Sequence, residues 1–127
     1  MKLNTMEPNP TWGPAGYEDA VEALGRAGLT FKVWGGDWCK DCRQQLPDFA
    51  AALREAGVPR EHIEQFPVEK EEDGSKTGPQ VEEYDIEFIP TIVVEKDGSE
   101  VARYVEDESI PAAAYLGERL EEAEQTA

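Results

Sequence analysis

The spacing of apolar side chains divides the chain into alternating helices and strands. Between Tyr17 and Ala27 the apolar residues recur every three or four positions, which predicts a helix that stops at Gly28. A short β-rich run then predicts a strand over residues 29–34, and two glycines end it. The helical spacing returns afterwards and predicts a second helix, which ends at Gly57 and contains a proline expected to kink it.

The middle of the chain is more polar, and its pattern is weaker. Residues 63–69 alternate enough between apolar and polar positions to predict a strand. A charged loop follows over residues 70–78, and residues 79–84 are predicted to form a short helix. We expect the loop to be a solvated segment with at most a minor part in the choice of partners.

The last third of the chain contains its clearest strand. This strand, over residues 91–95, is joined to a returning strand over residues 100–105 by a turn with Asp97 and Gly98 at its centre. A closing helix begins near Pro111. A βαβ unit that leads into an antiparallel hairpin predicts an α/β fold, with a mixed sheet of four core strands and helices on both faces.

The first fifteen residues follow neither the helical nor the strand period. We interpret residues 1–15 as an arm that lies over the surface, and residues 16–127 as one folded domain. A chain of 127 residues, of which 39% are hydrophobic, is long enough to bury a single core. It has no apolar run that approaches the length of a membrane span, and its start lacks the basic and apolar stretches of a secretory signal. We therefore expect a cytoplasmic protein.

The charge of the chain is extreme, because 28 acidic residues against 12 basic ones give a net charge of −16 at pH 7. Such a surface repels phosphate groups, so we expect neither nucleic acids nor anionic membranes as partners. The carboxylates occur in every segment instead of in one block. A local patch would match a basic partner, whereas a dispersed excess favours adaptation to concentrated salt. We therefore favour a protein from a halophile.

The two cysteines of the chain, Cys39 and Cys42, lie where the first strand gives way to the second helix. Asp37 stands where a helix N-cap is expected. Free N–H groups and the helix dipole at such a position lower the pKa of a thiol and favour the reactive thiolate. A second thiol one turn further on can attack the mixed disulfide that the first one forms. We predict that Cys39 is the nucleophile and that Cys42 is the resolving thiol.

Two other interpretations of the cysteine pair are weaker. A disulfide between residues so close in sequence constrains the unfolded chain very little, so the pair would be a poor staple. A zinc site needs four ligands, and only His62 and carboxylates could complete one here. We expect no metal, and we place His62 at the surface or at the edge of a helix.

Together with more distant motifs, the cysteine pair resembles the thioredoxin superfamily over about residues 17–123. The shared motifs are Trp38-Cys39-x-x-Cys42, Pro47 in the helix that follows, Phe88-Ile89-Pro90-Thr91 before a strand, and the Asp97-Gly98 turn. The resemblance implies a thioredoxin-like fold, in which a four-stranded mixed sheet is flanked by helices. It also implies that a cis peptide bond precedes Pro90 and that Ile89 offers its backbone to an extended substrate segment.

The same resemblance implies an enzyme that reduces disulfides in proteins or small molecules by dithiol exchange. Its only redox group would be the Cys39–Cys42 disulfide, so we expect no cofactor. A flavin-dependent reductase or a low-molecular-weight thiol would supply the electrons, and we expect a monomer. The alternative is a redox-sensing binding module on the same scaffold, which would dock a specific protein and have little general reductase turnover.

Several positions depart from the prototype thioredoxins. Val33 occupies the place of a buried aspartate, so deprotonation of Cys42 needs another base or water. Lys40 and Asp41 separate the cysteines, as in small thioredoxin-related reductases that have a Trp-Cys-x-Asp-Cys site and a narrower set of partners. Glu106 stands where thioredoxins keep a glycine, at the rim of the substrate groove.

The aromatic residues near the cysteine pair have separate expected roles. We expect Trp38 to shield the reactive thiol and to offer a contact surface to partners. We assign Phe31 and Trp34 to the core. The predicted supporting and substrate-binding residues are Trp38, Lys40, Asp41, Ile89, Pro90 and Glu106.

Overall fold

The computed structural model describes residues 3–13, 15–26, 28–72, 76–78, 80–105 and 111–126. The helices are α1 (Glu18–Leu24), α2 (Lys40–Glu55) and α3 (Ala112–Thr126), with two short 3-10 turns, η1 (Asn4–Met6) and η2 (Arg60–His62). The strands are β1 (Leu29–Gly35), β2 (Ile63–Pro67), β3 (Glu69–Lys70), β4 (Lys76–Thr77), β5 (Thr91–Lys96) and β6 (Ser99–Val105). Among the described residues, no helix is both long and apolar enough to cross a membrane.

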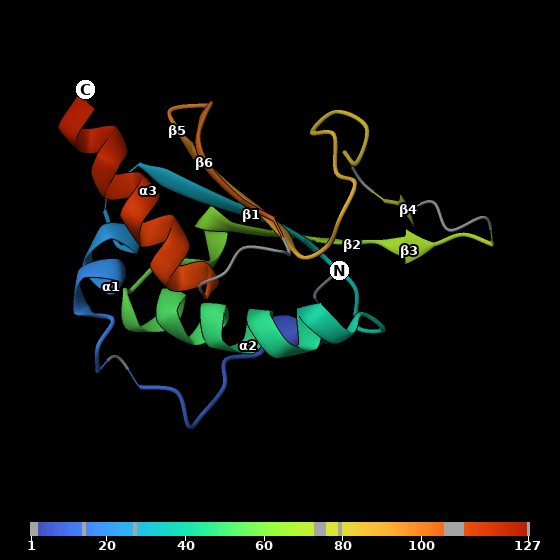
Figure 1. Ribbon diagram of the computed structural model, residues 1–127, viewed down its shortest axis with the longest axis horizontal. Coiled ribbons are helices and arrows are strands. Elements are labelled where there is room, and N and C mark those ends of the chain that lie inside the picture. The colour runs from blue at the N-terminus through green and yellow to red at the C-terminus, as the bar shows by residue number, and fades with distance from the viewer. Residues whose placement is uncertain are drawn as a thin grey trace.

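Four strands form one mixed sheet in the order β2–β1–β5–β6 (Figure 1). β1 runs parallel to β2 and antiparallel to β5, and a hairpin joins β5 to β6. The predicted four-stranded mixed sheet is confirmed. In the hairpin turn, Asp97 and Gly98 have φ angles of 53° and 83°. A two-residue turn that matches the twist of its strands requires this left-handed backbone, which explains the Asp-Gly sequence.

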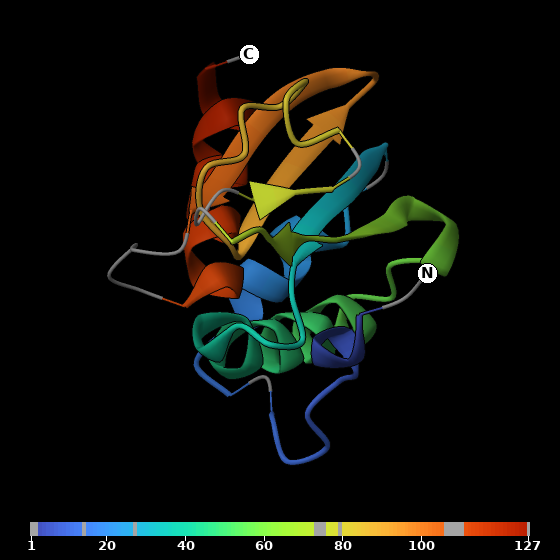
Figure 2. The same cartoon turned by 90° about the vertical axis from the view of Figure 1, so that its right-hand side faces the viewer.

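The two faces of this sheet are covered differently. Figure 1 and Figure 2 show α1, α2 and α3 together on one face, and the turn-rich segment that precedes β5 on the other. On the helix face, the rings of Phe31 and Phe49 lie 6.2 Å apart. On the second face, the ring of Trp34 lies 4.7 Å from that of Phe66 and 5.0 Å from that of Tyr84. Phe31 and Trp34 are fully buried, which confirms their assignment to the core.

The helix predicted over residues 79–84 does not form in the part that the structure describes. One helical turn begins, with the N–H of Tyr84 donated to the carbonyl oxygen of Gln80 at 3.1 Å. Gln80 and Asp85 have φ angles of 59° and 54°, and this left-handed backbone interrupts a right-handed helix. The expectation of helices on both faces is therefore wrong, because turns bring Tyr84 and the buried Ile86 to the second face.

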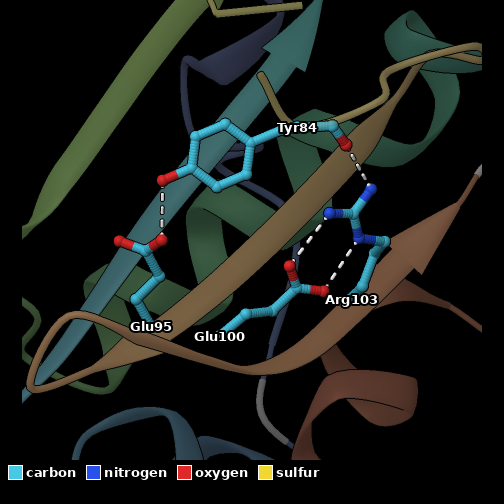
Figure 3. A network of polar contacts seen from close by, with 4 residues as sticks. All are labelled: Tyr84, Glu95, Glu100 and Arg103. Carbon is cyan, nitrogen blue, oxygen red and sulfur yellow. Dashed lines mark hydrogen bonds and ion pairs between the residues drawn. The ribbon is translucent and has the colours of Figure 1, made fainter. Parts of the chain in front are cut away.

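Polar contacts hold this turn-rich segment to the sheet (Figure 3). The hydroxyl of Tyr84 donates to the carboxylate of Glu95 on β5 at 2.7 Å. Arg103 on β6 donates to the carbonyl oxygen of Tyr84 at 2.8 Å and to both oxygens of Glu100 at 2.9 Å. The ammonium of Lys32 on β1 lies 4.0 Å from Glu95 and 5.5 Å from the centre of the Tyr84 ring. Charge-assisted contacts thus take part of the role that apolar packing has on the helix face.

The N-terminal arm is more buried than the sequence suggests. Leu3 and Met6 lie three residues apart, and both side chains belong to the hydrophobic core. The N–H of Leu3 donates to the side-chain oxygen of Gln65 at 2.7 Å, and the amide of Asn9 donates to Asp48 on α2 at 2.8 Å. The expectation of an arm on the surface is therefore wrong for its first described turn, which packs beside α2 (Figure 2).

One local prediction is also corrected. The strand predicted over residues 63–69 ends at Pro67. Its last residue, Glu69, belongs with Lys70 to β3, which pairs antiparallel with Lys76–Thr77. These two short strands lie at the edges of the stretch predicted as a loop. The predicted second helix, α2, contains Pro47 between Lys40 and Glu55, and the kink expected there stays a prediction.

Candidate dithiol active site

Cys39 caps the N-terminus of α2. Its backbone is extended, with φ −86° and ψ 122°, and its Sγ accepts the backbone N–H of Cys42 at 3.2 Å. The prediction of Asp37 as the N-cap is wrong, because the carboxylate of Asp37 accepts the N–H of Thr5 at 3.1 Å instead. The sulfur of Cys39 therefore occupies the position where a helix start stabilises negative charge.

The two cysteines, which are both free thiols, differ in their exposure. Cys39 keeps 8% of its surface accessible, whereas Cys42 is fully enclosed. Burial is the largest effect that raises the pKa of the Cys42 thiol above its usual range, and the hydrogen bond with Cys39 raises it further. A hydrogen bond from the backbone of Gly36 opposes this shift without cancelling it. Both thiols are thus buried, and Cys39 is the slightly more accessible of the two. Their roles as nucleophile and resolving thiol stay a prediction.

The loop around Ile89 and Pro90 lies beside the cysteine pair. The peptide bond between these two residues is cis, as the resemblance implies. The Sγ of Cys39 lies 3.8 Å from the carbonyl oxygen of Ile89, which is 50 residues away in sequence. The hydroxyl of Thr91 donates to the carbonyl oxygen of Phe88 at 2.5 Å, which fixes the loop where β5 begins. The fold thus brings the two distant motifs of the sequence together.

Two exposed aromatic side chains accompany these motifs. Trp38 and Phe88 are the large apolar side chains that remain exposed among the described residues, at 45% and 49%. The indole N–H of Trp38 donates to the carbonyl oxygen of Val68 at 2.9 Å. The ring also lies against Gly36, where an added β-carbon would lie 2.6 Å from Nε1. Phe88 belongs to a motif that carries the resemblance, but no separate role was predicted for it, although its place directly before Ile89 was an available signal.

The other residues singled out in the sequence lie in several places. Lys40 and Asp41 are exposed on the first turn of α2, and Val33 is fully buried in β1. Glu106 falls outside the described residues, so its position in the groove stays a prediction. His62 is exposed on η2, and the described residues contain no group of three or more His, Cys, Asp or Glu side chains that could hold a metal ion.

Comparison with known proteins bears on the architecture. No protein-family model and no curated protein matches the sequence. Among solved structures, a mutant thioredoxin from Halobacterium salinarum NRC-1 aligns with a TM-score of 0.50 and 18% identity, over 97% of this chain and 96% of that one. The chain has a thioredoxin-like fold. At this identity the likeness concerns the fold, so the chemistry of the site rests on the residues of this chain.

Proposed function

We propose that the chain is a thiol–disulfide oxidoreductase that reduces disulfides in proteins or small molecules through Cys39 and Cys42. The observation that carries the proposal is the contact at the start of α2, where the Sγ of Cys39 accepts the N–H of Cys42 at 3.2 Å. A sulfur held by an N–H donor at a helix start is stabilised as a thiolate, which is the nucleophile of disulfide exchange. The enclosed thiol one turn further on supplies the second half of the reaction.

In the first step, the Cys39 thiolate attacks one sulfur of the substrate disulfide. The substrate S–S bond breaks, its other sulfur leaves as a thiolate and takes up a proton, and Cys39 becomes joined to the substrate. In the second step, Cys42 loses its proton and attacks the sulfur of Cys39. The bond to the substrate breaks, the substrate leaves fully reduced, and a Cys39–Cys42 disulfide remains. A flavin-dependent reductase or a low-molecular-weight thiol returns two electrons and two protons to this disulfide.

The loop before β5 and the residues around Cys39 position the substrate. The backbone of Ile89 lies beside the Cys39 sulfur and can align an extended substrate segment. Trp38 and Phe88 offer exposed apolar surface near the same sulfur, while Lys40 and Asp41 add charges of opposite sign. The net charge of −16 favours basic or uncharged substrates over acidic ones.

Reduction of insulin and of a small disulfide reagent, with dithiothreitol as electron donor, tests this function. The native chain should turn over both substrates, and Cys39→Ser should abolish turnover. Cys42→Ser should stop at the mixed disulfide, so the substrate stays attached to Cys39 and mass spectrometry can identify it. The absence of turnover in the native chain would overturn the proposal. Partners captured by Cys42→Ser without turnover would favour the redox-sensing module instead.

We also infer that the acidic surface is an adaptation to concentrated salt. At ~0.01 M ionic strength the Debye length is ~30 Å, so repulsion within a surface of charge −16 is hardly screened, whereas at ~1 M it is ~3 Å. Added KCl should therefore raise the melting temperature markedly, beginning well below molar concentration. A melting temperature that is the same in dilute buffer and in molar KCl would contradict this inference.

A further inference from the structure

The thiol of Cys42 lies in an apolar space that the N-terminal segment helps to close. A β-carbon placed on Gly35 would lie 2.9 Å from a methyl carbon of Leu46, 3.3 Å from a methyl carbon of Leu3 and 3.5 Å from the Sγ of Cys42. These three side chains therefore surround the same small volume beside the end of β1. Leu3 retains only 4% of its surface, and Cys42 retains none. Leu3, from the N-terminal segment, thus borders the same space beside Gly35 as this thiol.

Specific polar contacts hold the segment in this position. The N–H of Leu3 donates to Gln65 on β2 at 2.7 Å, and the N–H of Thr5 donates to Asp37 at 3.1 Å. The N–H of Met6 returns to the carbonyl oxygen of Leu3 at 3.1 Å and closes the turn. One of these anchors, Asp37, lies between β1 and α2, two residues before Cys39. The turn is therefore tied both to the sheet edge and to the site itself.

The charged groups around Cys42 oppose the loss of its proton, and the hydrogen bond from the backbone of Gly36 only partly offsets them. The charged groups that act on this thiol are Cys39 and Asp41, and both raise the pKa of Cys42. Val33, in the adjacent strand β1, is apolar and fully buried. The carboxylate of Asp37 is already bonded to the N–H of Thr5. Water can accept the proton of Cys42, and the access of water depends on the groups that enclose the sulfur.

We propose that Leu3 is a positioning residue of the site, which excludes water from Cys42 and so sets the rate at which Cys42 resolves the mixed disulfide. This role rests on the proposed dithiol exchange. It does not alter the first attack, because Cys39 lies at the helix start and keeps its own accessible surface. The segment therefore acts on the second step of the reaction and not on the first.

The two steps can be separated with an aromatic disulfide reagent that releases thionitrobenzoate. Attack by Cys39 releases one coloured anion, and attack by Cys42 on the mixed disulfide releases the second, so rapid mixing gives two phases. In Leu3→Ala the first phase should keep its rate, while the second should become faster by about tenfold. This is the change in thiolate fraction that one unit of pKa produces.

Alkylation provides a readout that needs no reductase activity. In Cys39→Ser, iodoacetamide can react with Cys42 alone, and the serine oxygen can still accept the N–H of Cys42. Adding Leu3→Ala should increase this reaction by about tenfold. The matched control is Met6→Ala, which removes a buried side chain from the same turn that is not among the three nearest to a β-carbon on Gly35. Met6→Ala should lower stability to a similar degree and leave the alkylation of Cys42 unchanged.

The hydrogen bond from the N–H of Thr5 to Asp37 gives an independent test, because its removal leaves the side chains of Leu3 and Leu46 unchanged. Asp37→Ala removes the acceptor of the Thr5 N–H and should accelerate the second phase, by less than Leu3→Ala does. Asp37→Asn keeps an oxygen in place and should restore the native rate. Near-ultraviolet circular dichroism verifies that each variant is folded. If Leu3→Ala does not fold, Leu3→Val serves as a milder change.

The outcomes distinguish this role from the function on which it rests. If Leu3→Ala does not increase the alkylation of Cys42, or if Met6→Ala increases it equally, the role of Leu3 is overturned. If the native chain gives no second phase while Leu3→Ala still increases alkylation, dithiol exchange fails and the enclosure of Cys42 by Leu3 stands. Two results together support both the role of Leu3 and the proposed dithiol exchange. In Leu3→Ala the second phase becomes faster and the first keeps its rate, and in Asp37→Asn the second phase has the native rate.

Discussion

The two faces of the central sheet are held by different kinds of contact. On the helix face, Phe49 of α2 meets Phe31 of β1, and both side chains are buried from water. On the second face, Tyr84 packs on Trp34 but remains partly exposed. Its segment is tied to the sheet by the polar contacts of Arg103, shown in Figure 3, and by the bond from its own hydroxyl.

As a result, the cysteines and the loop around Ile89 are held in place by different kinds of contact. Cys39 and Cys42 belong to α2, which rests on the apolar face. Ile89 follows the turn-rich segment, whose position depends on a few hydrogen bonds. Removing apolar contacts from the first face should therefore unfold the whole chain. Removing polar contacts from the second face should loosen the loop around Ile89 and Pro90 while the cysteines keep their place.

The largest effect is expected for an aromatic side chain on the helix face. Phe49→Ala should lower the free energy of unfolding by about 3–5 kcal/mol, because the cavity forms in a closely packed core. Tyr84→Ala, the matched change on the second face, should lower it by less, because its ring is partly exposed. Denaturation in guanidinium chloride measures both. Equal losses would show that the two faces support the fold to the same degree.

A smaller effect is expected at Arg103. Arg103→Ala removes charge-assisted bonds to Glu100 and to the carbonyl oxygen of Tyr84, and should destabilise the chain by about 1–3 kcal/mol. Hydrogen exchange should accelerate around residues 84–91 and stay unchanged in α2. Arg54→Ala, at an exposed position of α2, is the control and should change stability by less than ~0.5 kcal/mol. Faster hydrogen exchange in α2 as well would contradict the idea that the contacts of Arg103 support only the second face of the sheet.

The smallest effect is expected for the loss of one hydroxyl group. Tyr84→Phe removes the bond to Glu95 and should lower stability at neutral pH by about 1 kcal/mol. The bond to Glu95 is the main cause that raises the pKa of Tyr84. A raised pKa means that the contribution is complete below the ordinary tyrosine pKa and disappears as the pH rises through the folded-state value.

Denaturation of Tyr84→Phe and of the native chain should therefore differ at neutral pH and converge at strongly alkaline pH. A difference that stays constant with pH would mean that ionisation of Tyr84 does not contribute to stability. Phe at this position keeps the packing on Trp34, so the comparison isolates the hydroxyl group.

Elements whose structure is set locally were predictable from the sequence. The Asp97-Gly98 turn is an example, because its left-handed backbone follows from the residues themselves. The strand that begins at Thr91 is another, because its β-branched side chains suit a buried sheet. The approach of Cys39 to Ile89 spans 50 residues, and only the resemblance to a known family anticipated it.

Elements whose structure depends on distant surfaces were predicted wrongly. Leu3 and Met6 occupy a single 3-10 turn, which is too short to show a period, and α2 provides the surface that buries them. The helix predicted over residues 79–84 fails because Tyr84 and Ile86 must reach the second face of the sheet. In both cases the energy of long-range packing exceeds the local preference.

The long separation between Cys39 and Ile89 also has a consequence during protein synthesis. A ribosome completes α2, with both cysteines, well before it makes β5, which pairs with the central strand β1. In the growing chain the two thiols emerge without the carbonyl oxygen that later lies beside them. Under the proposed function, redox competence therefore depends on the synthesis of the last strands. A chain interrupted before Ile89 contains both cysteines without the loop that lies beside Cys39.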